Sequence, residues 1–115
     1  MVQTPIEEDN IRKKTIDRFY TAITSLKKRD NIVQFLNALL TPTEKERLAK
    51  RLEILKKLRR GSSYKEIRNS LSVTDNTIAE MSNILKEMTK KETKVLDKLI
   101  REDLLSEDKP LKFRQ

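Results

Sequence analysis

Apolar residues recur at helical spacing through residues 1–40. Between Ile6 and Lys28 they form one stripe, which predicts an amphipathic helix: Ile16, Phe19, Tyr20, Ile23 and Leu26. A shorter helix is expected over residues 32–40, where apolar side chains cover more than one face. Such a helix needs burial on several sides, and a single thin chain supplies that poorly. The pattern therefore predicts that residues 1–40 are dimerisation helices buried by a second copy of the chain.

A long central helix is predicted over residues 41–61, with signals at both ends. Thr41 is an N-cap candidate, a proline follows at the first helical position, and Glu44 completes a capping box. Gly61, the single glycine of the chain, fits the position just after the helix end. One face is apolar: Leu48, Leu52, Ile54, Leu55 and Leu58. The other positions are mostly basic, Lys56 among them, and eight basic against three acidic residues give a net charge of +5.

Residues 63–88 have the spacing of a helix-turn-helix. Ser63 and Glu66 form a second capping box that opens a short helix ending near Leu71, and Thr74 is the N-cap candidate of the next helix. A small apolar cluster is expected to fix the angle between the two helices: Ile67, Leu71, Val73 and Ile78. The second helix is expected to bury four residues: Ile78, Met81, Met88 and either Ile84 or Leu85. The alternative is two ordinary packed helices, which show the same pattern.

The exposed positions of this second helix are candidates for reading DNA. In a helix-turn-helix, the first turn of the second helix meets the major groove, where amides and carboxylates pair with base edges. The side chains expected to face the bases are Asp75, Asn76, Ala79, Glu80 and Asn83. Thr74 and Thr77 are available to phosphates.

The C-terminal part completes an all-α pattern. A last amphipathic helix over residues 90–106 is expected to carry five apolar residues: Val95, Leu96, Leu99, Ile100 and Leu104. Residues 107–115 are polar and are expected to form a flexible tail. The sequence thus predicts a single all-α domain of about six helices over residues 1–106. Its expected parts are the N-terminal helices (1–40), the central helix (41–61), the helix-turn-helix (63–88) and the C-terminal helix (90–106).

Composition removes most classes of enzyme. The chain has 115 residues, no cysteine, no histidine and one glycine. Without these residues, a disulfide, a thiol nucleophile, an imidazole base, a zinc site of the usual ligands and a Gly-rich phosphate loop are excluded. We therefore expect a protein that is not an enzyme and has no metal site.

The net charge of the chain indicates which class of molecule it binds. A net charge of +8 and an isoelectric point near 9.8 favour a polyanion such as nucleic acid. No apolar stretch is long enough to span a membrane, and the basic helix lacks aromatic residues for a membrane surface. The first ten residues are acidic and polar, unlike a signal peptide, so a cytoplasmic protein without a membrane partner is expected.

A resemblance to the Trp repressor family lies in three consecutive features: the run Leu40-Thr-Pro-Thr-Glu-Lys-Glu-Arg-Leu-Ala-Lys-Arg-Leu-Glu-Ile-Leu, the stop Leu58-Arg-Arg-Gly61, and the helix-turn-helix. The Ser-Tyr-Lys-Glu-Ile run and the shorter link after Gly61 are most similar to its small YerC-type branch. The resemblance covers about Leu36 to Leu85, roughly half of the chain. Ser72 replaces the usual turn glycine, a change that is tolerable where the turn avoids a left-handed conformation.

The resemblance implies an all-helical, intertwined homodimer. Its two recognition helices would lie about one DNA turn apart, ~34 Å, and read a near-palindromic operator in double-stranded DNA. Lys65 and Arg68 would meet the DNA from the first helix of the motif, while Asp75, Asn76, Ala79 and Glu80 approach base edges. The candidates for backbone phosphates, which position the protein without specifying sequence, are Arg60, Ser62 and Tyr64.

Two positions depart from the tryptophan-responsive members of the family, which hold their ligand with two arginines. Arg51 matches the first arginine, but Glu80 stands at the second, and Met81 stands where those members have a small residue. A carboxylate would repel the carboxylate of the ligand, and Met81 would fill the space of the indole. No cofactor is therefore expected, and in particular no tryptophan corepressor. Arg51, the remaining cofactor-binding candidate, is equally suited to a salt bridge with Glu46 or Glu53.

The second helix of the motif is acidic. Residues 74–88 carry three carboxylates, Asp75, Glu80 and Glu87, against one Lys86, a net charge of −2. Lys65, Arg68 and the basic central helix compensate for the resulting repulsion of phosphates. The leading hypothesis is a homodimeric, sequence-specific DNA-binding transcriptional regulator. The alternative is a non-enzymatic protein-interaction module that keeps the fold, has lost DNA binding and contacts a basic partner through the acidic helix.

Overall fold

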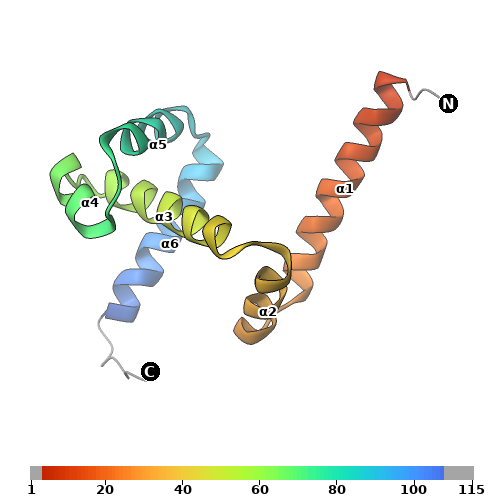
Figure 1. The fold of residues 1–115 in the computed structure, drawn as a ribbon, viewed down its shortest axis with the longest axis horizontal. Helices are drawn as coiled ribbons and strands as arrows, with labels where there is room; N and C mark the ends of the chain where they lie inside the picture. The colour runs from red at the N-terminus through yellow and green to blue at the C-terminus, as the bar shows by residue number, and fades with distance from the viewer. Residues whose placement is uncertain (1–3, 108–115) are drawn as a thin grey trace. The chain divides into compact units, whose positions relative to one another are not determined.

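The computed structural model describes residues 4–107, which confirm the all-α fold class (Figure 1). The helices of this part of the chain are α1 (Pro5–Ser25), α2 (Arg29–Leu39), α3 (Pro42–Arg59), α4 (Tyr64–Leu71), α5 (Asp75–Glu87) and α6 (Lys90–Glu107). The chain divides into two compact units, one up to Lys45 and one from Glu46 onward, so the boundary falls near the start of α3. Among the described helices, none is long and apolar enough to cross a membrane. Of the expected tail, Glu107 still belongs to α6, and residues 108–115 lie outside the described residues.

The starts of the helices follow local capping rules. At α3, the Thr41 hydroxyl accepts from the Glu44 backbone N–H at 3.1 Å, and the Glu44 carboxylate accepts from the Thr41 N–H at 2.8 Å. This capping box satisfies two backbone donors that the helix cannot satisfy itself. The same reciprocal pair starts three other helices of the described chain: Thr4–Glu7 at α1, Ser63–Glu66 at α4 and Thr89–Glu92 at α6.

The end of α3 is set by the single glycine. Gly61 has a φ of 91°, a left-handed conformation that side-chain-bearing residues rarely adopt. Its N–H donates to the Leu58 carbonyl at 3.0 Å, and the Ser62 N–H donates to the Lys57 carbonyl at 2.9 Å. These two bonds are those of a Schellman motif, which satisfies the last carbonyls of a helix. The predicted start and stop of the central helix are both confirmed.

The first unit consists of α1, α2 and the first residues of α3, and its apolar side chains are poorly covered. Phe19 of α1 and Phe35 of α2 approach with their ring centroids 6.2 Å apart. Even so, neither helix has a buried residue in the described structure. Six large apolar side chains of α1 are exposed: Ile6, Ile11, Ile16, Phe19, Tyr20 and Ile23. The stripe predicted from the sequence is therefore present, and this chain alone leaves it facing solvent.

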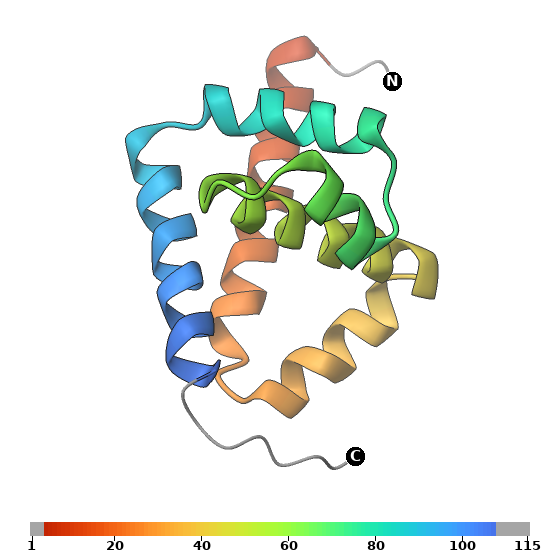
Figure 2. The same ribbon diagram turned by 90° about the vertical axis from the view of Figure 1, so that its left-hand side faces the viewer.

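The second unit holds the core, and Figures 1 and 2 show α5 lying over α3 and α6 running from the end of α5 past α3. Ile54 of α3, Ile67 of α4, and Ile78 and Met81 of α5 are buried and pack in one cluster. The partly buried residues against it are Leu55, Leu58, Leu71 and Val73. This cluster contains all four residues that were expected to fix the angle of the helix-turn-helix.

Some apolar positions that were expected to be buried are exposed. Leu48 and Leu52 of α3 are 53% and 38% exposed, so the buried face of the helix centres on Ile54 instead. On α5, Ile84 is 38% exposed and Leu85 takes the inner position. On α6, only Leu96 and Ile100 are buried, whereas Val95, Leu99 and Leu104 are exposed. The stripe on each helix is thus wider than the surface that its own unit covers.

Lys56, one of the basic residues of the central helix, is buried. Its side chain is mostly buried, and its amino group donates to Asp103 of α6 at 2.7 Å and pairs with Glu53 at 3.0 Å. Burial by itself would lower the pKa of Lys56. The hydrogen bonds and charges of Asp103 and Glu53 outweigh it, so the pKa is raised and the amine stays charged.

A second ion pair joins α3 to α6. Arg59 donates to both carboxylate oxygens of Asp97, from Nε at 2.9 Å and from Nη2 at 3.1 Å. This two-pronged hydrogen bonding lowers the pKa of Asp97 and raises that of Arg59. Together with the Lys56–Asp103 pair, it anchors the C-terminal helix to the scaffold that carries the helix-turn-helix.

We predict that an Asp97→Asn variant is less stable than the wild type at neutral pH and that this difference disappears in acid. Because folding lowers the pKa of Asp97, the pair stabilises the protein above the ordinary aspartate pKa of about 3.9 and is lost as the pH falls through the lower folded-state value. Urea unfolding of both proteins between pH 7 and pH 2, at one protein concentration, measures the difference. A difference that stays constant across this range would contradict the assignment.

Candidate nucleic-acid interface

The first helix of the motif, α4, is fixed at its start by Ser63. The Ser63 N–H donates to the Glu66 carboxylate at 2.7 Å, and the Ser63 hydroxyl accepts from the Glu66 N–H at 3.2 Å. The backbone hydrogen bond, followed by the side-chain one, lowers the pKa of Glu66. Ile67 then points into the core with no exposed surface, while Tyr64 and Lys65 remain exposed. The cap therefore determines which side of this eight-residue helix faces outward.

The turn contains the one non-glycine residue of the described chain with positive φ. Ser72 has φ 54° and ψ 54°, which is the left-handed conformation. The condition under which a serine is tolerable here, a turn that avoids the left-handed conformation, is therefore not met. The left-handed conformation costs a residue with a Cβ about 1–2 kcal/mol. This strain is held in place by Ile67 and Ile78 packing on either side of the turn.

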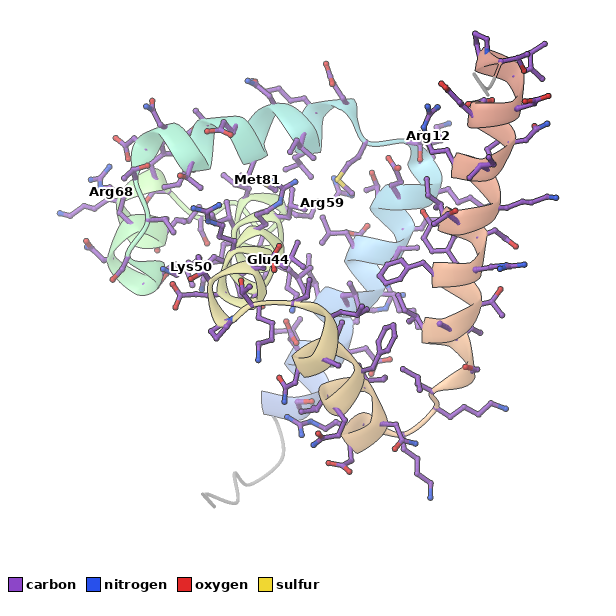
Figure 3. The ribbon with its side chains drawn as sticks, turned by 45° about the vertical axis from the view of Figure 1, so that its right-hand side comes forward. Arg12, Glu44, Lys50, Arg59, Arg68 and Met81 are labelled. Carbon is purple, nitrogen blue, oxygen red and sulfur yellow. The ribbon has the colours of Figure 1, made fainter. Side chains whose placement is uncertain are left out.

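The second helix, α5, starts at the predicted N-cap. The Thr74 hydroxyl accepts from the Thr77 N–H at 3.3 Å, and the two threonine hydroxyls lie 3.1 Å apart. Ile78 and Met81 turn inward, and Met81 lies between α5 and α3 in Figure 3. The start of α5 is thereby held in a defined orientation relative to α4.

The structure gathers the predicted DNA-contacting residues on the outer side of the segment from α3 to α5. Most of their side chains are exposed: Arg60, Tyr64, Lys65, Arg68, Thr74, Asp75, Asn76, Ala79, Glu80 and Asn83. Ser62 and Thr77 are half-buried, the latter beside its cap. Their accessibility agrees with a binding surface, and their roles toward DNA stay predictions.

An ion pair within this surface was not expected from the sequence. The Arg68 Nη1 atom lies 2.7 Å from Asp75 Oδ1, so the last turn of α4 is bonded to the first residue of α5. The spacing of seven residues across a turn has no simple helical rule, so only the angle of the two helices reveals the pair. One of the three carboxylates of α5 is thus neutralised by a neighbouring guanidinium.

Arg51 is not paired as expected. Glu46 pairs with Lys50 at 3.3 Å, and Glu53 pairs with Lys56 at 3.0 Å. Arg51 is exposed and has no ion pair or hydrogen bond with another described residue. The salt bridge to Glu46 or Glu53, one of the two roles considered for Arg51, is therefore not formed, because two lysines on the same helix occupy both carboxylates. Within the part of the chain that the structure describes, no group of three acidic residues is placed to hold a metal ion.

Comparisons with known proteins agree with this geometry. The family model described as Trp repressor protein matches residues 14–100, which include the core of the second unit and the whole helix-turn-helix. The uncharacterized protein YerC of Bacillus subtilis (strain 168) is 32% identical over 77 residues, which cover 67% of this chain and 74% of that protein. The matched region extends well beyond the motif, from α1 to α6. The chain belongs to the Trp repressor protein family, a family of regulators.

Proposed function

We propose that the protein is a sequence-specific, DNA-binding transcriptional regulator that acts as a homodimer through α4 and α5. The observation that carries this proposal is the capped start of α5, fixed by the buried Ile67–Ile78 contact region and surrounded by exposed polar side chains. The first turn of the second helix is the part of such a motif that enters the major groove. The role would be binding without catalysis.

The charges of the surface support DNA as the partner. Lys65 in α4 and Arg60 just before α4 are exposed cations, and Arg68 cancels the charge of Asp75. Arg68 therefore offsets one carboxylate of α5 directly, while Arg60 and Lys65 remain to attract phosphates. Positive charge near phosphates supplies most of the sequence-independent affinity for DNA.

The uncovered apolar residues of α1 support a homodimer. Ile16, Phe19 and Ile23 recur along one side of the helix and are all exposed in the single chain. Exposed apolar surface of this extent marks an interaction site. A second copy offers the same stripe, and a two-fold dimer would present two α5 helices to half-sites about one DNA turn apart, ~34 Å. The operator is then expected to be near-palindromic.

The decisive test of the function is a charge reversal at Lys65. A Lys65→Glu variant is expected to bind a selected operator about 100-fold more weakly than the wild type, since each dimer then places two carboxylates against the DNA. Fluorescence anisotropy with a labelled duplex measures the affinity. Lys98→Glu is the matched control, because Lys98 is an exposed lysine of α6, outside the motif, and undergoes the same change in charge.

Two results would count against the proposal. If Lys65→Glu and Lys98→Glu weaken binding equally, the contact surface is not α4–α5. If the wild type binds no duplex even at low salt, the interaction-module alternative replaces DNA binding, since a DNA binder gains affinity steeply as salt is removed. The exposed Glu80 and Glu87 of α5 would then be the place to look for a basic protein partner.

We also propose that regulation does not use tryptophan. The resemblance puts the ligand between Arg51 and the Glu80–Met81 positions, and Met81 is only 2% exposed and packs on Ile54 and Ile67. Glu80 adds a charge that repels a carboxylate ligand. Operator titrations with and without about 1 mM L-tryptophan are expected to give the same dissociation constant for the operator. A tenfold tighter operator complex with tryptophan would refute this expectation.

A further inference from the structure

The Arg68–Asp75 pair sits where α4 meets the start of α5. Arg68 is in the last turn of α4, and Asp75 is the first residue of α5, directly after the Thr74 cap. The Nη1–Oδ1 distance of 2.7 Å is that of a well-formed charge-assisted hydrogen bond, and both partners are substantially exposed, at 41% and 60% of their side-chain surface. The guanidinium is therefore held and still open to a ligand.

The pair contributes little to folding stability, so its effect lies in orienting a side chain. Both partners are exposed, and an exposed ion pair stabilises a fold only weakly, whereas the buried cluster of Ile54, Ile67, Ile78 and Met81 already fixes the two helices. What the bond changes is the freedom of a long side chain. A free arginine side chain loses rotamer entropy on binding, and a carboxylate that holds it beforehand removes part of that cost.

The donors that remain fit one kind of acceptor pair. A guanidinium has five N–H groups in a planar fork, and the bond to Asp75 uses one of them on Nη1. Four are left, including neighbouring donors on Nη2 and Nε. Guanine presents two acceptors, O6 and N7, side by side in the major groove, and a bidentate arginine is the commonest contact that reads them.

We propose that Asp75 is a positioning residue that holds Arg68 to read one guanine in each operator half-site. The inference rests on the proposed DNA-binding function and assigns its specificity to this pair. Arg68 supplies the contact to the base. Asp75 then acts through Arg68 instead of contacting a base edge itself, which changes the role predicted for it. The charges of the pair cancel, so the pair contributes to sequence discrimination more than to general attraction for phosphates.

The test compares discrimination with affinity. Duplexes selected by the wild type give the half-site, and a set with every single base-pair change is then titrated by fluorescence anisotropy. At one G·C position the wild type is expected to lose about 10- to 100-fold in affinity when the guanine is replaced. Arg68→Ala is expected to abolish this preference. Asp75→Asn and Asp75→Ala are expected to reduce it about fivefold or more while leaving binding to random duplex equal or tighter.

The matched control is Glu87→Gln, which also removes one negative charge from an exposed position on α5, lies outside the predicted DNA-contacting residues and leaves the Arg68–Asp75 pair intact. It is expected to change general affinity as Asp75→Asn does and to keep the guanine preference. Circular dichroism melts establish that each variant is folded. If Arg68→Ala is unfolded, Arg68→Lys replaces it, because lysine keeps the positive charge and lacks the planar guanidinium.

Several results would overturn the inference. If Asp75→Asn tightens binding to all duplexes and keeps the preference, Asp75 only competes with DNA for Arg68. If Arg68→Ala weakens all duplexes alike and lowers the salt dependence by about one per chain, Arg68 binds a phosphate. In both cases the proposed function stands. If the wild type binds no duplex, the proposed function itself fails and takes this inference with it.

Discussion

An Ile78→Ala variant is expected to lose about 3 kcal/mol of unfolding free energy. Ile78 has no exposed surface and packs on Ile54, Ile67 and Met81, so truncation leaves a cavity among three elements of the second unit. Buried isoleucine-to-alanine changes cost about 2–5 kcal/mol, and the melting temperature should fall by about 10–15 °C. Thermal and urea unfolding at one fixed protein concentration measure the change, since the stability of a dimer depends on concentration.

Ile84→Ala is the matched control for this prediction. It makes the same substitution on the same helix at a side chain that is 38% exposed. The better helix propensity of alanine offsets part of the small loss of packing, so a change below about 1 kcal/mol is expected. Equal losses from the two variants would contradict the position of the core.

A Phe19→Asp variant is expected to be monomeric at concentrations at which the wild type is dimeric. Phe19 lies in the exposed apolar stripe of α1 and approaches Phe35 of α2. A carboxylate at an apolar interface loses its hydration without gaining a partner. In a symmetric dimer the change occurs twice, so about 2 kcal/mol per copy raises the dissociation constant about 1,000-fold. Sedimentation velocity compares the observed mass with the 13.6 kDa of one chain.

Arg18→Ala controls for charge in this experiment. It changes the net charge by the same amount at the neighbouring position, which is an exposed cation outside the apolar stripe. The control is expected to remain dimeric. A monomeric wild type, or a dimer that survives Phe19→Asp, would show that the α1 stripe is not the dimer interface. A monomeric wild type would in addition remove the reason to expect a two-fold symmetric operator.

The features that the sequence predicted well are those specified within one or two turns of helix. Thr41, Ser63 and Thr74 start their helices where expected, because a cap needs only a side chain and the N–H groups of the next turn. Gly61 ends α3 for an equally local reason. The packing of Ile67, Leu71, Val73 and Ile78 within the helix-turn-helix was also predictable, since these four residues lie within a dozen residues of one another along the chain.

The features that the sequence did not predict depend on residues far apart or on the angle between helices. Lys56 is buried because Asp103, 47 residues later, reaches it from α6. Leu48 lies on the same leucine-rich helix as Ile54 but is exposed, because periodicity gives the direction of a face and not the length of the surface that covers it. Ser72 is left-handed because the packing of its neighbours overrides its own preference.

The repeated capping box has a consequence for how the chain folds. Four of the described helices begin with a hydroxyl residue and a glutamate three positions later, and each box forms its two bonds inside a single turn. The helix boundaries can therefore be selected in the nascent chain before any distant contact exists. Helix formation takes less than a microsecond, so the slow steps left to folding are the docking of preformed helices and the meeting of two chains. Refolding should then speed up with protein concentration while helical signal is recovered first.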